Sequence, residues 1–248
     1  MKHPTSLLLT ALAATFLLAK ASQAQTIIYQ EDFSRPSSQL LDGLQPEPVN
    51  TDSATWNTLT WRADGTWQMG NVATALNRMA FLPVSIESDR VYTLTGTLTA
   101  VPNSQMYLGF SPSNSTSAGA DGTFRMRINY DGTTDLLTRM NGSSEVESSS
   151  YAGEAVTFGL TLDTTQTAWV GSFAINGNVV RTEAFGSNPT SLTYVYFGGR
   201  RGDTTGNGSD TVVTADDFSL AVIPEPSSFA FLAASLAAMT LLLRRRQS

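Results

Sequence analysis

Three groups of side chains in this sequence could do chemistry, and the first is acidic. Asp203, Asn207, Asp210, Asp216 and Asp217 form a stretch in which glycines allow the backbone to turn. Ca²⁺ takes about six to eight oxygen ligands from carboxylates and carbonyls, so this stretch could hold calcium. The spacing does not match an EF-hand loop, and a solvated acidic loop before the last strand is the alternative interpretation.

Three tryptophans form the second group, because Trp56, Trp61 and Trp67 stand five and six residues apart. Exposed aromatic rings can stack on sugar rings, and Arg62 and Asp64 lie between the tryptophans as planar polar partners. The spacing is therefore compatible with a carbohydrate contact surface. The other interpretation is that these rings pack the interior, since buried aromatic side chains dominate core energetics.

Glu145 and Glu147 are the nearest approach to a pair of catalytic carboxylates. Glycoside hydrolysis generally uses two such groups, one as an acid and one as a nucleophile or base. These glutamates lack a third carboxylate nearby and lie in a stretch rich in Ser and Gly. The sequence therefore favours a solvated pair of charges.

The composition excludes most other catalytic chemistry. The chain has 248 residues and no Cys, its single His is His3, and Lys occurs only at Lys2 and Lys20. Between Gln25 and Ile223 it holds 10 Arg and 20 Asp plus Glu, for a net charge of −10. This segment has no disulfide, thiol nucleophile, imidazole base or catalytic lysine. Its negative charge argues against nucleic acid as a partner. We expect no enzymatic activity and, calcium apart, no cofactor.

The elements that must position these groups are predicted to be β-strands. Seven runs are rich in alternating, β-branched or aromatic residues, and clusters of turn residues separate them. These runs are 26–29, 90–100, 105–111, 123–130, 155–162, 168–175 and 192–197. Only 71–79 shows a weak helical pattern, while 111–122 and 143–150 are predicted loops. The dipeptides Asp131-Gly132, Asn141-Gly142 and Asn176-Gly177 predict tight hairpin turns.

Similar Asp-Phe-Ser triplets stand near both ends of this segment, at 32–34 and 217–219. They predict adjacent terminal strands that each bury a phenylalanine. The stretch 156–180, VTFGLTLDTTQTAWVGSFAINGNVV, resembles the three-strand element of laminin-G-like and other concanavalin-A-like jelly rolls, with Asn176-Gly177 as its hairpin. We therefore expect an all-β chain with a single antiparallel β-sandwich of jelly-roll type over 25–222, or another sandwich as the alternative.

Residues 1–24 predict a secretory signal peptide. Lys2 supplies positive charge, an apolar stretch runs over 7–19, and small residues precede a cleavage site between Ala24 and Gln25. A transmembrane anchor is the alternative, but the stretch is short for a span and ends at Lys20. We expect export through the secretion translocon and removal of the signal by signal peptidase.

Residues 223–248 have three parts: Pro224, Glu225 and Pro226, then an apolar run at 227–243, then Arg244, Arg245 and Arg246. As a helix the run would be about 25 Å long, slightly short of a hydrocarbon core of ~30 Å. The arginines would hold its end on the cytoplasmic side. An ordinary tail anchor is one interpretation. The combination, with Ile223-Pro224-Glu225-Pro226-Ser227 directly before the helix, resembles the PEP-CTERM sorting signal of Gram-negative bacteria.

That resemblance implies that an exosortase, a membrane-embedded cysteine protease-transpeptidase, cuts near Pro224-Glu225-Pro226. The implied protein crosses the inner membrane of a Gram-negative bacterium, is anchored transiently by its C-terminal transmembrane helix, and then reaches the cell surface or the medium. Hosts of such signals make exopolysaccharide and biofilm. We expect a non-catalytic surface or matrix protein associated with exopolysaccharide. The alternatives are a lectin-like carbohydrate-binding module and, less favoured by these residues, a carbohydrate-active enzyme.

Overall fold

The computed structural model describes residues 25–58, 60–68, 77–99, 104–115, 124–130, 134–140, 143–148, 154–189, 191–201 and 212–224. Thr26–Val222 form one compact unit. The predicted signal peptide and the C-terminal apolar run lie outside the described residues. Within the described residues, no helix is long and apolar enough to span a membrane.

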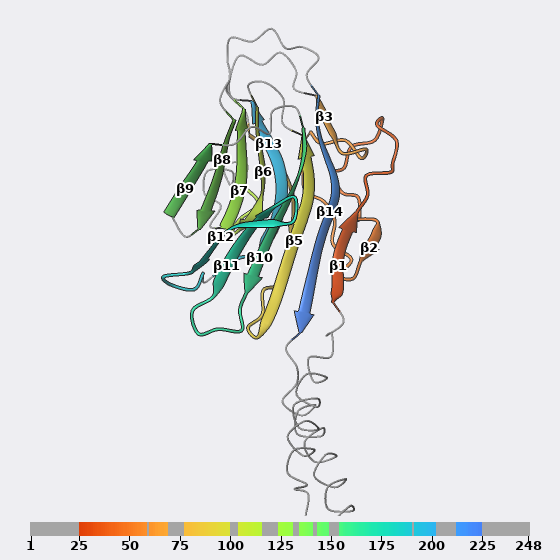
Figure 1. The fold of residues 1–248 in the computed structure, drawn as a ribbon. Coiled ribbons are helices and arrows are strands. Elements are labelled where there is room, and N and C mark those ends of the chain that lie inside the picture. Colours follow the sequence, from red (N-terminus) through yellow and green to blue (C-terminus); the bar gives the residue numbers. More distant parts are fainter. Residues whose placement is uncertain are drawn as a thin grey trace, which may run out of the picture. The chain divides into compact units, whose positions relative to one another are not determined.

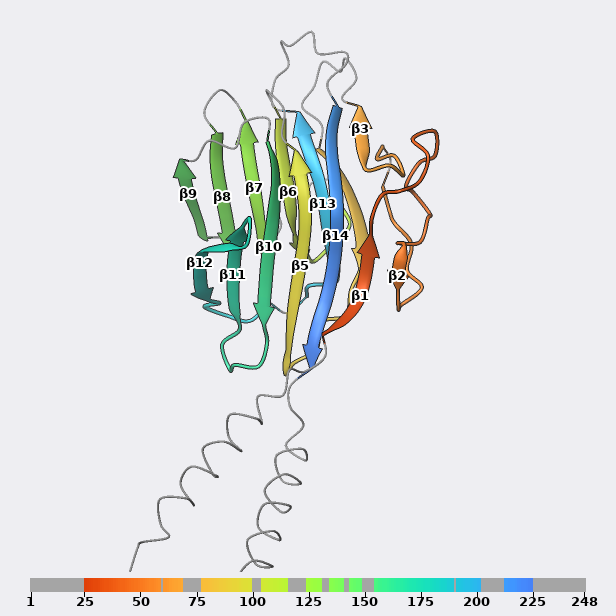
Figure 2. The same ribbon diagram turned by 45° about the vertical axis from the view of Figure 1, so that its right-hand side comes forward.

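Two β-sheets form this unit, one layer upon the other (Figures 1 and 2). The eight-stranded sheet has the order β12-β11-β10-β5-β14-β1-β2, with β3 paired to β14 beside this path. The six-stranded sheet has the order β4-β13-β6-β7-β8-β9. The strands are β1 Thr26–Glu31, β2 Pro48–Asn50, β3 Thr66–Gln68, β4 Asn77–Pro83, β5 Arg90–Thr99, β6 Ser104–Ser111, β7 Phe124–Tyr130, β8 Thr134–Met140, β9 Ser143–Ser148, β10 Ala155–Asp163, β11 Val170–Ile175, β12 Asn178–Ala184, β13 Tyr194–Arg201 and β14 Val212–Pro224.

The alternation of side chains explains why these segments form a sandwich. In β5, Leu94 and Leu98 are 0% and 1% exposed, whereas the threonines between them are only partly buried. One of these, Thr97, shares a hydroxyl hydrogen bond of 3.0 Å with Thr157 of the adjacent β10. A period of two places one face of each strand in the core. The prediction of an all-β antiparallel sandwich is confirmed for the described part of the chain.

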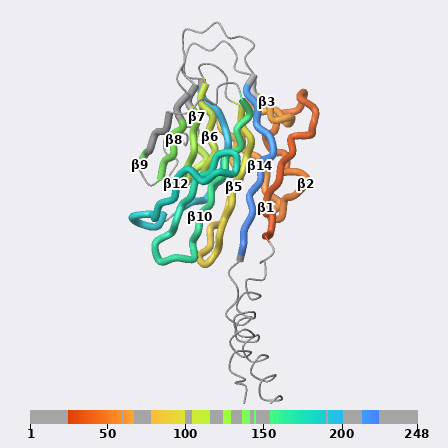
Figure 3. Tube along the Cα trace, viewed as in Figure 1, coloured from red at the N-terminus to blue at the C-terminus, as the bar shows by residue number. Residues whose placement is uncertain are grey.

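The two terminal strands are adjacent, as the Asp-Phe-Ser triplets predict. β1 pairs antiparallel with β14, so that Glu31 lies opposite Phe218, and Figure 3 shows the red and blue segments side by side. Phe33 and Phe218 are 6% and 1% exposed. Both triplets therefore bury their phenylalanine in the core.

The predicted hairpin at Asn176-Gly177 is also confirmed. Ile175 of β11 pairs with Asn178 of β12, which leaves a two-residue turn with φ values of 48° at Asn176 and 80° at Gly177. A type I′ turn requires positive φ at both central residues, and Asn-Gly adopts it at low cost. The other two dipeptides lie outside the described residues, although the strands on either side of each, β7–β8 and β8–β9, are paired.

Two local predictions are wrong. The weak helical pattern at 71–79 overlaps β4, which begins at Asn77 and pairs with β13. Met79 and Ala80 are both buried, because this strand is covered on both faces and its sequence lacks a clear alternation. The predicted loop at 143–150 contains β9, which pairs with β8. Its Ser and Glu residues are typical of a loop, so the composition of this segment does not indicate a strand.

Candidate functional site

Trp56 and Trp61 do not form a surface for sugar rings, so that prediction is wrong for these two residues. They are 1% and 0% exposed. The indole nitrogen of Trp56 donates to Glu31 Oε2 at 3.1 Å, and that of Trp61 donates to the carbonyl of Arg78 at 3.1 Å. Both rings therefore pack in the core, as the alternative interpretation predicts.

Phe197 of β13 is the centre of this aromatic packing. Its ring centroid lies 4.8 Å from Trp61, 5.3 Å from Trp56 and 5.5 Å from Phe33, with edge-to-face geometry in each case. Such pairs contribute about 0.5–1.5 kcal/mol beyond the area that they bury. The segment between β1 and β3 thus closes the side of the sandwich with its aromatic residues.

The remaining predicted sites are only partly within the described residues. Trp67 lies on β3 opposite Val213, and its side chain is outside the description. Asp216 and Asp217 are exposed on β14, but Asp203 and Asp210 are not described. Within the described part of the chain no group of three His, Cys, Asp or Glu side chains could hold a metal ion. The calcium site therefore stays a prediction.

The residues of the predicted processing sites fall at or beyond the same limits. Pro224 ends β14, and Gln25 is exposed just before β1. The others are not described: Ala24, Glu225, Pro226, Arg244, Arg245 and Arg246. Glu145 and Glu147 belong to β9, opposite Thr138 and Leu136. Cleavage and sorting stay predictions from sequence.

The face of the six-stranded sheet that points away from the core, here called the outer face, carries a different set of functional side chains. Strand pairing aligns them in two rows across the sheet. One row runs over β4, β13, β6, β7 and β8 as Phe81, Tyr196, Gly109, Arg125 and Arg139. The neighbouring row, in the same order, is Met79, Gly198, Tyr107, Arg127 and Leu137.

The outer face has a second, smaller hydrophobic cluster that is separate from the main core. It consists of Met79, Phe81, Tyr107 and Tyr196, against which Tyr194 packs. All except Tyr194 are at most 3% exposed. A sheet face turned from the core is ordinarily polar, so the aromatic cluster sets this face apart.

Arg125 is buried in this cluster and lacks an anionic partner among the described residues. It is 4% exposed, and its Nε and Nη1 groups have no hydrogen-bond acceptor. Its guanidinium carbon lies 5.5 Å from the centre of the Tyr107 ring, a cation–π distance. Burial lowers the pKa of Arg125, and the charges of Arg139 and Arg127 lower it further. The fold thus holds a desolvated cation beside two others.

Tyr196 lies on the other side of Gly109 from Arg125 and is fully buried. Its hydroxyl has no hydrogen-bond acceptor among the described residues. Burial raises the pKa of Tyr196 well above its usual range, and the positive charge of Arg125 reverses only part of that rise. Tyr196 therefore stays a neutral phenol that can donate a hydrogen bond.

Gly109 and Gly198 create the space in which these side chains lie. A Cβ at Gly109 would come within 2.7 Å of both the Arg125 Cβ and the Phe124 carbonyl oxygen. A Cβ at Gly198 would lie 2.4 Å from the Met79 sulfur and 2.5 Å from the Arg78 carbonyl oxygen. Real Cβ contacts are longer than these, so each glycine is required by the close approach of its neighbours.

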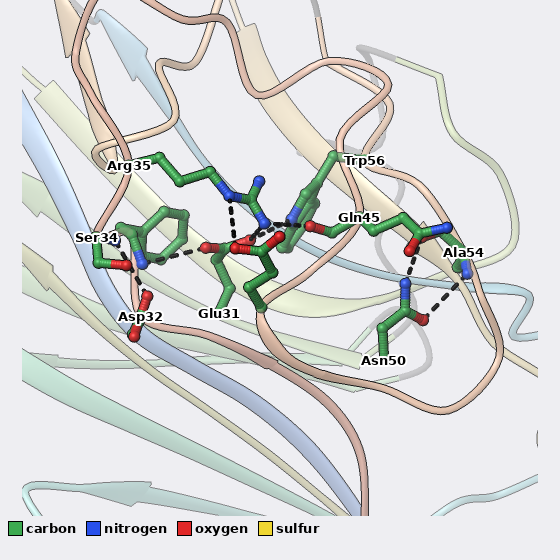
Figure 4. A network of polar contacts seen from close by, with 10 residues as sticks. Glu31, Asp32, Ser34, Arg35, Gln45, Asn50, Ala54 and Trp56 are labelled. Carbon is green, nitrogen blue, oxygen red and sulfur yellow. Dashed lines mark hydrogen bonds and ion pairs between the residues drawn. The ribbon is translucent and has the colours of Figure 1, made fainter.

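A second buried charged residue is Glu31, the last residue of β1 in the eight-stranded sheet (Figure 4). Glu31 is 0% exposed and accepts hydrogen bonds from the Phe33 backbone N–H at 3.2 Å and from Trp56 Nε1 at 3.1 Å. Arg35 Nη2 lies 3.5 Å from its Oε2 and also contacts the Gln45 carbonyl. Burial raises the pKa of Glu31, while these contacts partly oppose the rise. These contacts hold the segment between β1 and β3 against the sandwich.

Sequence reasoning missed the outer-face residues, although a signal for them exists. Arg125 and Arg127 alternate with the buried Phe124, Met126 and Ile128. A period of two therefore assigns both arginines to one face, away from the core. The sequence does not reveal that Tyr107 and Tyr196 lie on the same face beside them, because this depends on pairing between distant strands.

No protein-family model matches this sequence, and no match was found among curated proteins. Solved structures do match. An endo-1,3-β-glucanase from Streptomyces sioyaensis has a TM-score of 0.53 at 11% identity, over 83% of this chain and 98% of that one.

Two further structures match less closely. The carbohydrate recognition domain of Emp47p has a TM-score of 0.41 at 10% identity, over 78% of this chain and 100% of its own. A mutant of the alginate lyase Aly36B in complex with alginate trisaccharide has a TM-score of 0.44 at 10% identity, over 69% and 88%. At these identities the likeness concerns the fold alone. The likeness to the glucanase supports a concanavalin-A/galectin-like β-sandwich fold for this chain.

Proposed function

We propose that this chain is an exported, non-catalytic surface or extracellular-matrix protein whose sandwich contacts exopolysaccharide through its outer face. The observation that carries the proposal is the combination, on this face, of the partly exposed Tyr194 with buried hydrogen-bonding groups that have no partner among the described residues. Buried polar groups ordinarily have partners. Hydroxyl-rich ligands supply such partners, and the partly exposed ring of Tyr194 supplies an apolar face against which a sugar ring can lie.

The proposal of export and sorting rests on the two ends of the sequence. Residues 1–24 match the pattern of a secretory signal, and Pro224-Glu225-Pro226 precedes an apolar run and three arginines. The proposed partners are the secretion translocon, signal peptidase and an exosortase. The two prolines would hold the intervening glutamate extended, which suits a peptide bound by a protease.

Two features support a non-catalytic role. Glycoside hydrolysis requires two carboxylates about 5–10 Å apart. Along the described strands of the six-stranded sheet, pairing assigns one acidic residue, Asp135, to the outer face. Tyr196 keeps its proton because burial raises its pKa, so it does not supply a phenolate base. Binding suits this face better than acid–base chemistry.

A lectin-like module with a defined ligand is the second candidate. The observation that favours it over loose matrix association is that the charged and aromatic groups of the site stand on paired strands of one sheet. Groups held in place before binding lose less conformational entropy when a ligand arrives. A single glycan class would then bind far better than others.

Binding of the full-length chain to a glycan array, in a detergent without a sugar headgroup, tests the carbohydrate contact. Tyr194 is partly exposed at the edge of the outer-face cluster, so we expect Tyr194→Ala to weaken binding. Val179 is 66% exposed on β12 of the other sheet, so Val179→Ala is the matched control. Absence of binding by the wild type, or equal losses from both substitutions, would contradict the proposal.

Fractionation of host cells with and without their exosortase tests the sorting. We expect the surface or medium fraction to hold a form that lacks the C-terminal tail only when the exosortase is present. Mass spectrometry of the C-terminus identifies the cut. Retention of the intact tail in both strains would indicate an ordinary tail anchor instead.

A further inference from the structure

The outer face has a marked imbalance of charge. Arg125, Arg127 and Arg139 lie together on β7 and β8, and Arg125 is directly opposite Arg139. Like charges opposite each other on a sheet are destabilising. None of the ion pairs formed within the described residues includes Arg125 or Arg127. This local excess of positive charge stands in a segment whose net charge is −10.

The two arginines on β7 also have unused hydrogen-bond donors. Nε and Nη1 of Arg125 and Nε of Arg127 are buried without acceptors in the described part of the chain. Alternate residues of a strand lie roughly 6.8 Å apart on one face, so the two arginines can contact groups on different sugar rings of one oligosaccharide. Arg127 is partly exposed, while Arg125 lies deeper against the Tyr107 ring. A ligand that approaches the outer face would therefore contact Arg127 before it reaches the deeper Arg125.

The missing partner must be an acceptor and must carry negative charge. Removing a guanidinium from water without an anion is costly, and an ionised acceptor restores most of that cost. The planar guanidinium matches a carboxylate, which accepts two parallel N–H bonds. The Tyr196 hydroxyl, protonated and without an acceptor, supplies one more donor on the same face.

We propose that the outer face recognises an acidic glycan, with Arg125 and Arg127 binding the carboxylates of uronate residues. This inference rests on the proposed carbohydrate contact and adds the class of saccharide. The partly exposed ring of Tyr194 provides the apolar surface for the sugar, and the arginines select its charge. Because the rest of the chain is negative, attraction of a polyanion by net charge does not explain such binding.

Titration calorimetry of the full-length chain with oligogalacturonate, in a detergent without a sugar headgroup, tests the inference. The matched ligand is the methyl ester of the same oligomer, which keeps the sugar chain and removes its charge. Dextran sulfate measures the effect of charge without a carboxylate. We expect the wild type to bind the free acid, and to bind the ester and dextran sulfate at least 10-fold more weakly.

Two substitutions locate the site. We expect Arg127→Gln and Arg125→Met each to weaken binding of the free acid by roughly 10- to 100-fold, the range for a lost hydrogen bond to a charged group. Arg90 on β5 is partly exposed and pairs with Glu87, so Arg90→Gln is the control and leaves binding unchanged. Arg125→Met has a second readout: removal of an uncompensated buried charge should leave the Tm unchanged or raise it.

Each outcome decides the inference. Equal binding of the acid and its ester, or full binding by Arg127→Gln, would overturn the acidic-glycan assignment and leave the carbohydrate contact intact. Equal binding of dextran sulfate would replace carboxylate recognition by general anion binding. Binding of no glycan at all would overturn the proposed function with it. A large decrease in the Tm of Arg125→Met would assign Arg125 a structural role.

Discussion

Replacing Glu31 by Gln tests how the buried ion cluster of Figure 4 holds the loop to the sandwich. The carboxylate accepts hydrogen bonds from the Phe33 N–H and the Trp56 indole N–H, and it forms an ion pair with the Arg35 guanidinium. Gln has nearly the same shape but only one acceptor oxygen. Its NH₂ group must then face a buried donor, because each neighbour of the carboxylate that the structure describes is a donor.

The size of the effect follows from that mismatch. A buried donor left without an acceptor costs about 1–3 kcal/mol. Arg35 keeps its contacts with Glu47 and the Gln45 carbonyl, so it is not left uncompensated. We therefore expect Glu31→Gln to lower the free energy of unfolding by about 1–3 kcal/mol. For a domain of this size the Tm decreases by roughly 2–12 °C.

The pH dependence provides a sharper signature. Burial raises the pKa of Glu31 in the folded state above its ordinary value, so folding favours the protonated form. Its contribution to stability is complete below the unfolded pKa and is lost as the pH rises through the folded pKa. Gln does not titrate. The difference in stability between wild type and Glu31→Gln should therefore be largest at acidic pH and narrow toward neutral pH.

Urea unfolding monitored by tryptophan fluorescence, at a series of pH values from below 4 to 7, measures this difference. Asp32→Asn is the matched control, because Asp32 is the exposed neighbour of Glu31 and its hydrogen bonds with Ser34 lower its pKa. The stabilising effect of Asp32 is present above its unfolded pKa and is lost on acidification. A Glu31→Gln difference that widens as the pH rises would refute the reasoning, as would a variant as stable as the wild type throughout.

Three further substitutions have expected outcomes that chemical denaturation can check. Gly171→Ala should destabilise the fold by about 1–3 kcal/mol, because the new Cβ would lie 2.6 Å from a methionine sulfur and 2.7 Å from a phenylalanine ring. Gly96→Ala is the control and should cost less, because its Cβ would have its nearest contact at 3.4 Å. Equal losses of stability in the two variants would contradict this prediction. Trp61→Phe should cost about 1–3 kcal/mol, since the carbonyl of Arg78 loses its indole donor; an unchanged midpoint would contradict that estimate. Arg181→Met should cost about 1–3 kcal/mol by freeing the Thr138 oxygens at 3.0 and 3.3 Å, whereas a neutral effect would mean that water replaces the guanidinium.

The strands with regular alternation were predictable from sequence. β5 and β10 present threonines on one face and large apolar residues on the other, and this period of two is unambiguous. The turn at Asn176-Gly177 was equally clear, because few residue pairs tolerate two successive positive φ values. β4 escaped prediction since both of its faces are buried, and a strand covered on both sides resembles a short buried helix in its pattern.

The sites were less predictable, for a physical reason. The interpretation of Trp56 and Trp61 as surface rings depended on their spacing, but both belong to a loop that folds back over the edge of the core. Spacing along a loop does not determine which face a side chain takes. Burial of the rings is set instead by Phe197 and Phe218, which lie more than 130 residues further along the chain.

The outer-face site combines a local and a non-local requirement. The alternation of Arg125 and Arg127 with apolar residues is local and could be read from the sequence. The alignment of Tyr196, Gly109 and Arg125 in one row is not, because it depends on the register of β13 on β6 and of β6 on β7. A shift of one residue in either pairing would move every side chain of a strand to the opposite face.

Two charged groups elsewhere in the fold, Glu31 and Arg181, provide a comparison for Arg125 of the outer face. Glu31 is enclosed with three donors, and the nearly buried Arg181 has the oxygens of Thr138 and the carboxylate of Glu183. These two charges therefore have partners within the sandwich, although Nη1 of Arg35 beside Glu31 has none among the described residues. Arg125, on β7, has two nitrogens, Nε and Nη1, without an acceptor among the described residues, and two cationic neighbours. The cation–π contact with Tyr107 replaces only part of the lost hydration, which is why we propose that a partner brings the missing anion.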